Sequence, residues 1–323
     1  MKKSNFKILL VVAAAAILIC GCIVLAGCDS LSPVPKTSPT PEISPTPEIT
    51  PGPTPIPLNA SGMTVRDRFV PPDGYTRVEP EPGSYGDYLL NMPLKEVGAP
   101  CFFYDGTDNT AAGGKIAVID QDVTRWQQCA DSIMRFHAEY LFENDRKAEI
   151  TYNFLSGFTC DFKHWMDGYR VDLSGKGSWY EAGKEPDSSY GALQDYLDII
   201  YQYCNTGSQQ SELIPITDPK TIRTGDVFVA TADQMGESLG HAVYVADTAE
   251  NAAGERIYLI FEGTTPASQV CLAKSNDETF GYYVKLDADG TLNITKTVFN
   301  EEESRYIEKT WTCPGQYARR FPD

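Results

Sequence analysis

The sequence predicts an α+β domain in which an antiparallel-rich sheet packs against helices. Two clear helical patterns come early in residues 59–323, and most runs rich in Val, Ile, Tyr and Phe come late. Helices followed by clustered strands are typical of α+β folds rather than of doubly wound α/β folds. No second linker or internal repeat divides this region. A single domain is therefore the simplest organisation.

Two helices are predicted from apolar residues at helical spacing. The first covers residues 123–143 and begins near Thr124. Its apolar positions are Trp126, Cys129, Ile133, Phe136, Tyr140 and Leu141. The second follows Ser188 or Ser189, either of which can cap a helix. Its apolar face carries Leu193, Tyr196, Leu197, Ile200 and Tyr203.

Strands are predicted where β-branched and aromatic residues concentrate between turn signals. The predicted strands are 116–119, 150–154, 226–230, 241–246, 257–262 and 292–299. The last of them follows a turn at 287–290, which has the sequence Asp-Ala-Asp-Gly.

The N-terminus has the pattern of an export signal. Three lysines, Lys2, Lys3 and Lys7, precede an apolar run at 8–19. The run leads to Leu25-Ala26-Gly27-Cys28, which resembles a bacterial lipobox. This resemblance implies a signal peptide at 1–27, a lipid on the sulfur of Cys28, and an extracytoplasmic domain anchored to the cell membrane. A plain transmembrane anchor is the alternative, because the apolar stretch is nearly long enough to span a bilayer.

Residues 28–58 form a Pro-, Thr- and Ser-rich stalk. Ten of the 22 prolines lie here, and the hexapeptide Ser-Pro-Thr-Pro-Glu-Ile occurs twice in succession. Proline at every second position removes backbone donors and prevents both helix and sheet. We expect an extended polyproline segment of about 90 Å or an unstructured tether.

The composition excludes several classes of function. The chain has 27 basic and 44 acidic residues, so its net charge is −17. No cluster of Lys or Arg is present, which argues against nucleic-acid binding. Three histidines leave little for a multi-histidine metal site, and the phosphate-binding and zinc-protease motifs are absent. We therefore predict neither a cofactor nor a metal.

Six cysteines fall in the predicted domain. They are Cys101, Cys129, Cys160, Cys204, Cys271 and Cys313. Six cysteines allow fifteen pairings, and the sequence does not choose among them. Free thiols are equally compatible with the sequence.

One histidine occupies a position suited to catalysis. His241 follows Gly240 at the start of a predicted strand, where a near-neutral imidazole can act as a general base. If the next hairpin closes symmetrically on 249–254, His241 lies directly opposite Glu262, with Cβ atoms about 5 Å apart. A carboxylate there can orient the imidazole and stabilise its charged form. A register slip of one residue would put the two side chains on opposite faces.

These residues resemble the pattern of papain-like cysteine hydrolases, particularly CHAP amidases and NlpC-type cell-wall peptidases. The matching positions are Gly225-Asp226, Gly240-His241 and Glu262. The resemblance implies a papain-like fold, a supporting role for Asp226, and a nucleophilic cysteine at the start of a helix.

Cys129 is the best candidate nucleophile. Gln128 could help to hold an oxyanion, and Cys101 and Cys160 are weaker candidates. The predicted helix start near Thr124 places Cys129 in the second turn on the apolar face. There the alternative is a small buried core residue.

Over nearly all of residues 65–300, the chain also resembles the bacterial domain-of-unknown-function family 4846. That family has no assigned activity, so it transfers no catalytic residues, and it tends to have Gln at position 262. The motifs are Arg68-Phe69-Val70-Pro71-Pro72-Asp73-Gly74-Tyr75, Leu94-Lys95, Tyr104-Asp105-Gly106, Gln127-Gln128-Cys129-Ala130-Asp131, Ala138-Glu139-Tyr140-Leu141, Ser156-Gly157-Phe158, Gly168-Tyr169-Arg170, Gly225-Asp226-Val227-Phe228 and Gly240-His241-Ala242-Val243.

Two hypotheses follow for the function. The first is a surface cysteine hydrolase that cleaves peptide or amide bonds of cell-wall material with Cys129, His241 and Glu262. The second is a non-catalytic lipoprotein that binds peptide or glycan in an aromatic groove. The aromatic residues of that groove would be Tyr152, Trp165, Tyr169, Trp179 and Tyr180.

Overall fold

The computed structural model describes residues 58–109, 116–300 and 305–322. The predicted signal peptide, Cys28 and all of the predicted stalk except Leu58 lie outside the described residues. Within the described part of the chain, no helix is long and apolar enough to cross a membrane.

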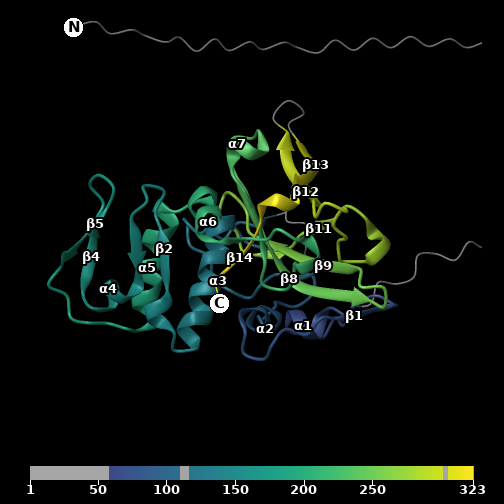
Figure 1. Cartoon of the computed structure of the whole chain (residues 1–323), viewed down its shortest axis with the longest axis horizontal. Coiled ribbons are helices and arrows are strands. Elements are labelled where there is room, and N and C mark those ends of the chain that lie inside the picture. The colour runs from purple at the N-terminus through teal and green to yellow at the C-terminus, as the bar shows by residue number, and fades with distance from the viewer. Residues whose placement is uncertain (1–57, 110–115, 301–304, 323) are drawn as a thin grey trace, which may run out of the picture. The chain divides into compact units, whose positions relative to one another are not determined.

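A seven-stranded antiparallel sheet forms the centre of the fold (Figure 1). Its order is β10 (Cys271–Leu272), β9 (Arg256–Glu262), β8 (His241–Asn251), β7 (Val227–Ala230), β14 (Ala318–Arg320) and β6 (Ile214–Pro215), with β1 (Tyr75–Arg77) paired to the end of β8. The long strand β8 therefore pairs with β7 through its first residues and with β1 through its last.

Helices cover one face of this sheet. The helices that contact it are α1 (Val65–Arg68), α2 (Tyr85–Leu90), α3 (Cys129–Glu143) and α6 (Thr206–Glu212). Two further helices, α4 (Phe162–Met166) and α5 (Tyr190–Tyr203), pack against each other, and α5 packs on α3. The short α7 (Ala232–Met235) follows β7, and its Met235 packs against the core on the other face of the sheet. Alternate strand residues such as Val229, Ala242 and Phe261 share a buried cluster with Ile133 and Phe136 of α3. The longest helix, α3, thus packs directly on β8.

A second sheet covers the opposite face. It consists of β11 (Lys274–Ser275), β12 (Leu292–Asn300) and β13 (Arg305–Cys313). Phe228, Val243 and Ile260 point to this side and pack with Ile294 and Trp311. The strand residues alternate between two cores, which explains why β7, β8 and β9 are apolar on both faces.

Two small hairpins complete the helical side (Figure 1). They are β2 (Thr151–Asn153) with β3 (Thr159–Asp161) and β4 (Tyr169–Asp172) with β5 (Ser178–Glu181). Single 3-10 turns lie at Lys147–Glu149, Pro219–Thr221, Glu278–Phe280 and Gly315–Tyr317.

The prediction of mixed helices and antiparallel sheet is confirmed, and so is the capping of α5. The Ser189 hydroxyl accepts a hydrogen bond from the Ala192 N–H at 3.2 Å. The predicted start of the first helix is wrong. Gln128 is extended, and α3 begins at Cys129, because the Gln128 N–H is bonded to the Asp131 carboxylate at 2.9 Å instead of continuing a helix.

Five predicted strands correspond to β2, β7, β8, β9 and β12. The sixth, at 116–119, is wrong. Val118 and Ile119 make only isolated bridges, to Cys271 and Leu94 respectively. The predicted turn at 287–290 is present, with the Gly290 N–H bonded to the Asp287 carbonyl at 2.8 Å.

Candidate active site

His241 and Glu262 meet at one end of the central sheet. The Nε2 atom of His241 lies 2.7 Å from Oε2 of Glu262, and both side chains are buried. The predicted register is wrong, because Glu262 pairs with Val243 rather than with His241. The hairpin closes on a tighter turn, with the Asn251 N–H bonded to the Glu255 carbonyl, and a bulge follows Val245.

The register differs from the predicted one by two residues. Because side chains alternate with a period of two, His241 and Glu262 stay on the same face as diagonal neighbours. A glutamate side chain is long enough to reach across such a diagonal. The predicted contact between the two side chains is therefore present although the strand register differs.

Gly240 is required by close packing before His241. A Cβ atom at this position would lie 2.3 Å from Thr206 Oγ1 and 2.7 Å from the Ala230 carbonyl oxygen. The chain thus enters β8 pressed between the end of β7 and the start of α6. This contact fixes where the strand begins and where the His241 ring lies.

Cys129 is the first residue of α3, and its thiol is hydrogen-bonded to the His241 side chain. The Ala242 N–H also donates to the sulfur. Since Nε2 of His241 is bonded to Glu262, Nδ1 is the ring atom left to face the thiol. The end of β9 closes the cluster, because a Cβ on Gly263 would lie 3.5 Å from the Cys129 Cα. Cys129, His241 and Glu262 thus form one chain of contacts.

The electrostatics of the cluster favour a thiolate beside an imidazolium. Burial raises the pKa of Cys129, but His241, with smaller contributions from the Ala242 N–H and Lys296, outweighs it and brings the pKa to about 7. Burial and Lys296 lower the pKa of His241, yet Cys129 and Glu262 raise it by more, so the net shift is upward. Burial raises the pKa of Glu262, whereas His241 and Lys296 bring it below its ordinary value. A thiol that titrates near neutrality, beside a base held by a carboxylate, is suited to nucleophilic chemistry.

Sequence reasoning missed two residues that contact this cluster. Trp311 of β13 packs edge-on against the His241 ring, with centroids 4.9 Å apart. Lys296 of β12 places Nζ 3.9 Å from Oε2 of Glu262. The signal for Lys296 was present in the alternation of β12, in which Leu292, Ile294 and Lys296 share one face. A lysine at an inward-facing position indicates a buried acidic partner.

A pocket of about 440 Å³ opens at the start of α3. Cys129 is only 4% exposed, but it borders this pocket and lies outside the large apolar cluster. Gln128 also lines it, and its Oε1 accepts a hydrogen bond from the Thr265 hydroxyl at 3.1 Å. Asp131, Cys204, Thr206, Asp233 and Gly240 also line the pocket.

Asp131 brings a buried carboxyl to the pocket. Its Oδ2 accepts the Gln128 N–H, whereas Oδ1 is buried without a hydrogen-bond partner among the described residues. Burial raises the pKa of Asp131 well above its ordinary value. Asp233 is the other charged residue in the lining, and no described Lys, Arg or His lines the pocket. The lining therefore offers two carboxyl groups and no described basic side chain.

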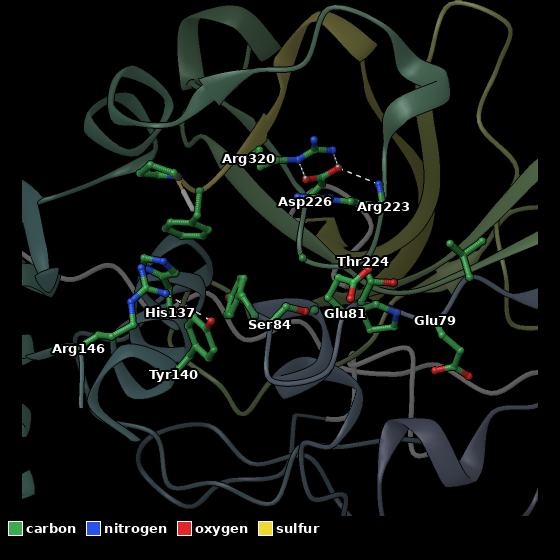
Figure 2. A pocket seen from close by; sticks show the side chains of 17 residues that line it. Glu79, Glu81, Ser84, His137, Tyr140, Arg146, Arg223, Thr224, Asp226 and Arg320 are labelled. Carbon is green, nitrogen blue, oxygen red and sulfur yellow. Dashed lines mark hydrogen bonds and ion pairs between the residues drawn. The ribbon is translucent and has the colours of Figure 1, made fainter. Parts of the chain in front are cut away.

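The predicted supporting role of Asp226 is wrong. Asp226 precedes β7, whereas the His241 cluster adjoins Ala230 at the far end of that strand. The Asp226 carboxylate instead accepts two 2.7 Å hydrogen bonds from Arg320 and one from the Arg223 N–H (Figure 2). These residues line a separate pocket of about 490 Å³, which His137 also borders.

The weaker cysteine candidates lie outside the cluster. Cys160 is packed in the helical core, and burial raises the pKa of its thiol. Cys101 packs with Val118 and Cys271 instead. All six domain cysteines are buried, and none of them is in a disulfide. Among the residues that the structure describes, no group of three or more His, Cys, Asp or Glu could hold a metal ion.

The predicted aromatic groove is divided between core and surface. Tyr152 and Trp165 are buried in the helical core. Trp179 stacks on His164 with ring centroids 4.9 Å apart, and Tyr180 beside it is 49% exposed. Tyr152 and Trp165 are therefore core residues, whereas Tyr169, Trp179 and Tyr180 lie on the β4–β5 hairpin.

Residues 65–305 match the family described as Domain of unknown function (4846). No curated protein and no solved structure matches the chain. Because the matched region includes most of the chain, from α1 to the start of β13, the chain belongs to the family Domain of unknown function (4846).

Proposed function

We propose that this protein is a cysteine-dependent amidase or peptidase that acts on cell-wall peptide. The observation that carries the proposal is the chain of contacts from the Cys129 thiol through His241 to Glu262. Nucleophile, base and orienting carboxylate are the three parts of a catalytic triad. The position of Cys129 at a helix start adds support, because the helix dipole favours a thiolate there.

The proposed reaction has two steps. The Cys129 thiolate attacks the carbonyl carbon of an amide, and the His241 imidazolium gives its proton to the departing amine. Water then attacks the resulting thioester, His241 accepts a proton from that water, the carboxylic acid is released, and the Cys129 thiolate and His241 imidazolium are restored. Glu262 holds the imidazole in place through both steps.

The carbonyl oxygen becomes an anion during both attacks and needs donors. The first N–H groups of a helix have no acceptor within the helix, and in α3 these begin at Cys129. Gln128 is the second donor in this proposal. Its Oε1 is held by Thr265, which leaves the amide nitrogen to act as the donor.

The arrangement supports a papain-like fold as part of the proposal. In this structure, as in papain-like folds, a helix carries the cysteine at its first turn and packs on an antiparallel sheet that carries the histidine. The lipobox at Cys28 and the proline-rich stalk lead us to propose an extracytoplasmic enzyme anchored to the membrane by a lipid. A stalk of this kind would hold the domain among the polymers of the cell wall.

The acidic residues of the pocket indicate which class of peptide substrate we propose. Asp131 and Asp233 line it without a described cation, so we propose an amine-bearing peptide. A bound ammonium group would give the buried Asp131 Oδ1 a partner and would favour ionisation of that carboxyl. The acidic balance of the whole chain also attracts cationic substrates.

Alkylation of the purified chain tests the nucleophile. Iodoacetamide should label Cys129 fastest among the domain cysteines at pH 7, and Cys129→Ala should remove that label without affecting the others. Cys160→Ala is the matched control, because Cys160 is buried and has a raised pKa. Equal labelling rates for Cys129 and Cys160, located by peptide mass spectrometry, would contradict the proposal.

Charged thiol reagents test the substrate class separately. A cationic methanethiosulfonate should modify Cys129 faster than an anionic one, and Asp131→Asn should reduce this preference severalfold. Asp233→Asn is the comparison, with a smaller expected effect because Asp233 is exposed. A preference unchanged by Asp131→Asn would reject the amine site, whatever the outcome of the alkylation test.

A further inference from the structure

Cys101 and Cys271 form a pair of contacting thiols that the candidate active site does not use. They and Val118 make up a small buried cluster that is separate from both main cores. The Cys101 thiol is hydrogen-bonded to the Cys271 side chain. The two cysteines are far apart in the sequence and come together only through the fold.

The backbone around the pair holds the two segments side by side. The Gln269 N–H is bonded to the Phe102 carbonyl at 2.9 Å, and the Cys101 thiol lies 3.3 Å from the Gln269 carbonyl oxygen. Lys95 adds a further link through a 2.6 Å bond to the Gln269 side chain. The contact between the two sulfurs is therefore fixed by neighbouring hydrogen bonds.

We infer that Cys101 and Cys271 close to an intramolecular disulfide as the chain folds, by exchange with an oxidised small thiol. The Cys101 thiolate attacks the disulfide of the donor, forms a mixed disulfide and releases one donor thiol. The Cys271 thiolate then attacks the Cys101 sulfur and releases the second. The two protons lost by the cysteines end on the two donor thiols, and the donor takes up the two electrons.

Cys101 is suited to make the first attack once its neighbours have come together and before the cluster is closed to the donor. The hydrogen bond from Cys271 lowers the pKa of Cys101 more than burial raises it, and Ser268 and Lys95 lower it further. The other thiols differ in this respect. Burial raises the pKa of Cys160, Cys204 and Cys313, so their thiolates are scarce at neutral pH.

The disulfide would link a short strand at the edge of the central sheet to a segment that is distant in the sequence. β10 has two residues and lies at the end of the strand order. Its first residue, Cys271, pairs with Glu262 of β9. Closing the bond would therefore tie the segment around Cys101 to the strand next to Glu262. A cross-link between distant positions restricts the unfolded chain strongly, so oxidation should raise stability.

Thiol mapping of the full chain tests the inference directly. The reduced chain is refolded in a series of reduced and oxidised glutathione mixtures, the remaining thiols are trapped with N-ethylmaleimide, and the unreduced digest is analysed by mass spectrometry. Refolding gives the buried sulfurs access to the donor. We expect the Cys101–Cys271 peptide as the main intramolecular disulfide, while Cys160, Cys204 and Cys313 stay alkylated. Alkylation of Cys101 and Cys271 in every mixture, or equal pairing of Cys101 with other cysteines, would overturn the inference.

Thermal unfolding provides the second measurement. The Tm of the oxidised chain should exceed that of the reduced chain by about 5 °C or more. Cys101→Ser and Cys271→Ser should abolish this difference, whereas Cys313→Ser should keep it. If both serine variants fail to fold, the comparison of the oxidised and reduced wild-type chain still decides. If the disulfide forms but the oxidised and reduced chains have equal Tm values, the proposed stabilisation of the sheet edge is refuted.

Discussion

At the scale of single residues, the reactivity of Cys129 depends on the charge of its neighbour. Burial alone would make the thiol less acidic, and the His241 imidazolium reverses that effect. Glu262 in turn stabilises the imidazolium, while Lys296 opposes it. The sign of each contribution predicts how the pH dependence of alkylation changes when one group is removed.

The first prediction concerns His241→Ala. In the wild type, the alkylation rate of Cys129 should rise with pH through about 7, where the thiolate forms. Without the imidazolium, burial dominates and the rise should move above the ordinary cysteine range. At pH 7 the rate should fall by more than about tenfold, since each pKa unit changes the thiolate fraction about tenfold. An unchanged profile, followed by mass spectrometry of the Cys129 peptide, would remove His241 as the activating group.

The second prediction concerns Glu262→Gln. Glutamine keeps a hydrogen bond to His241 but loses the charge, and Lys296 is then uncompensated. The alkylation rate at pH 7 should fall by about threefold to tenfold, less than for His241→Ala. Glu237→Gln is the matched control, because Glu237 pairs with Lys309 at the surface. A larger loss of alkylation rate for Glu262→Gln than for His241→Ala would contradict the assignment of His241 as the activating group and Glu262 as its support.

At the scale of elements, the first residues of one helix and of one strand position the site. The bond between the Gln128 N–H and Asp131 starts α3 at Cys129, and the close packing of Gly240 starts β8 at His241. Each device is local in sequence, but its result depends on the neighbouring element. The start of α6 and the end of β7 leave space only for a glycine at position 240.

The third prediction is that Gly240→Ala destabilises the domain. The added methyl group would lie 2.7 Å from the Ala230 carbonyl oxygen, so the backbone must shift. We expect a loss of about 1–3 kcal/mol in the free energy of unfolding, measured by urea denaturation. Gly191→Ala in α5 is the control, since a Cβ there would meet only Ser189 Oγ, at an ordinary contact distance of 3.7 Å. It should be neutral or gain up to about 1 kcal/mol.

At the scale of the whole molecule, the end of the chain is joined to the loop before β7. Arg320 of β14 makes a bidentate ion pair with Asp226, whose side chain is 1% exposed. The pair lies at the opposite end of β7 from the candidate site, beside the second pocket (Figure 2). We therefore assign Asp226 to stability rather than to chemistry.

The fourth prediction is that Asp226→Ala lowers stability without changing the reactivity of Cys129. Removal of the carboxylate takes its hydrogen bonds from the Arg223 N–H and from Arg320, whose side chain is 25% exposed, which costs about 1.5–3 kcal/mol. The alkylation rate of Cys129 under native conditions should remain within about twofold of wild type. Lys285→Ala, which breaks an exposed pair with Glu255, should cost less than about 1 kcal/mol. A selective loss of Cys129 reactivity in Asp226→Ala would restore Asp226 to the site.

The predictions from sequence were right where the pattern was local. Apolar periodicity identified α5, and Ser189 marked its start. The error at α3 arose because Trp126 fits the helical spacing, while the turn from 124 to 128 depends on a side-chain bond. The register error arose because a bulge and a tighter turn together move the pairing by two residues.

The sequence by itself determined the class of the fold and two of its chemical groups. The Gly-His pair and the acidic residue at the end of the next strand were visible because strand patterns and turn residues are local signals. The tertiary structure decided what those groups contact. It brought the start of α3 to the start of β8, separated Asp226 from the site, and added Trp311 and Lys296. Such contacts depend on how distant elements pack, which no local pattern encodes.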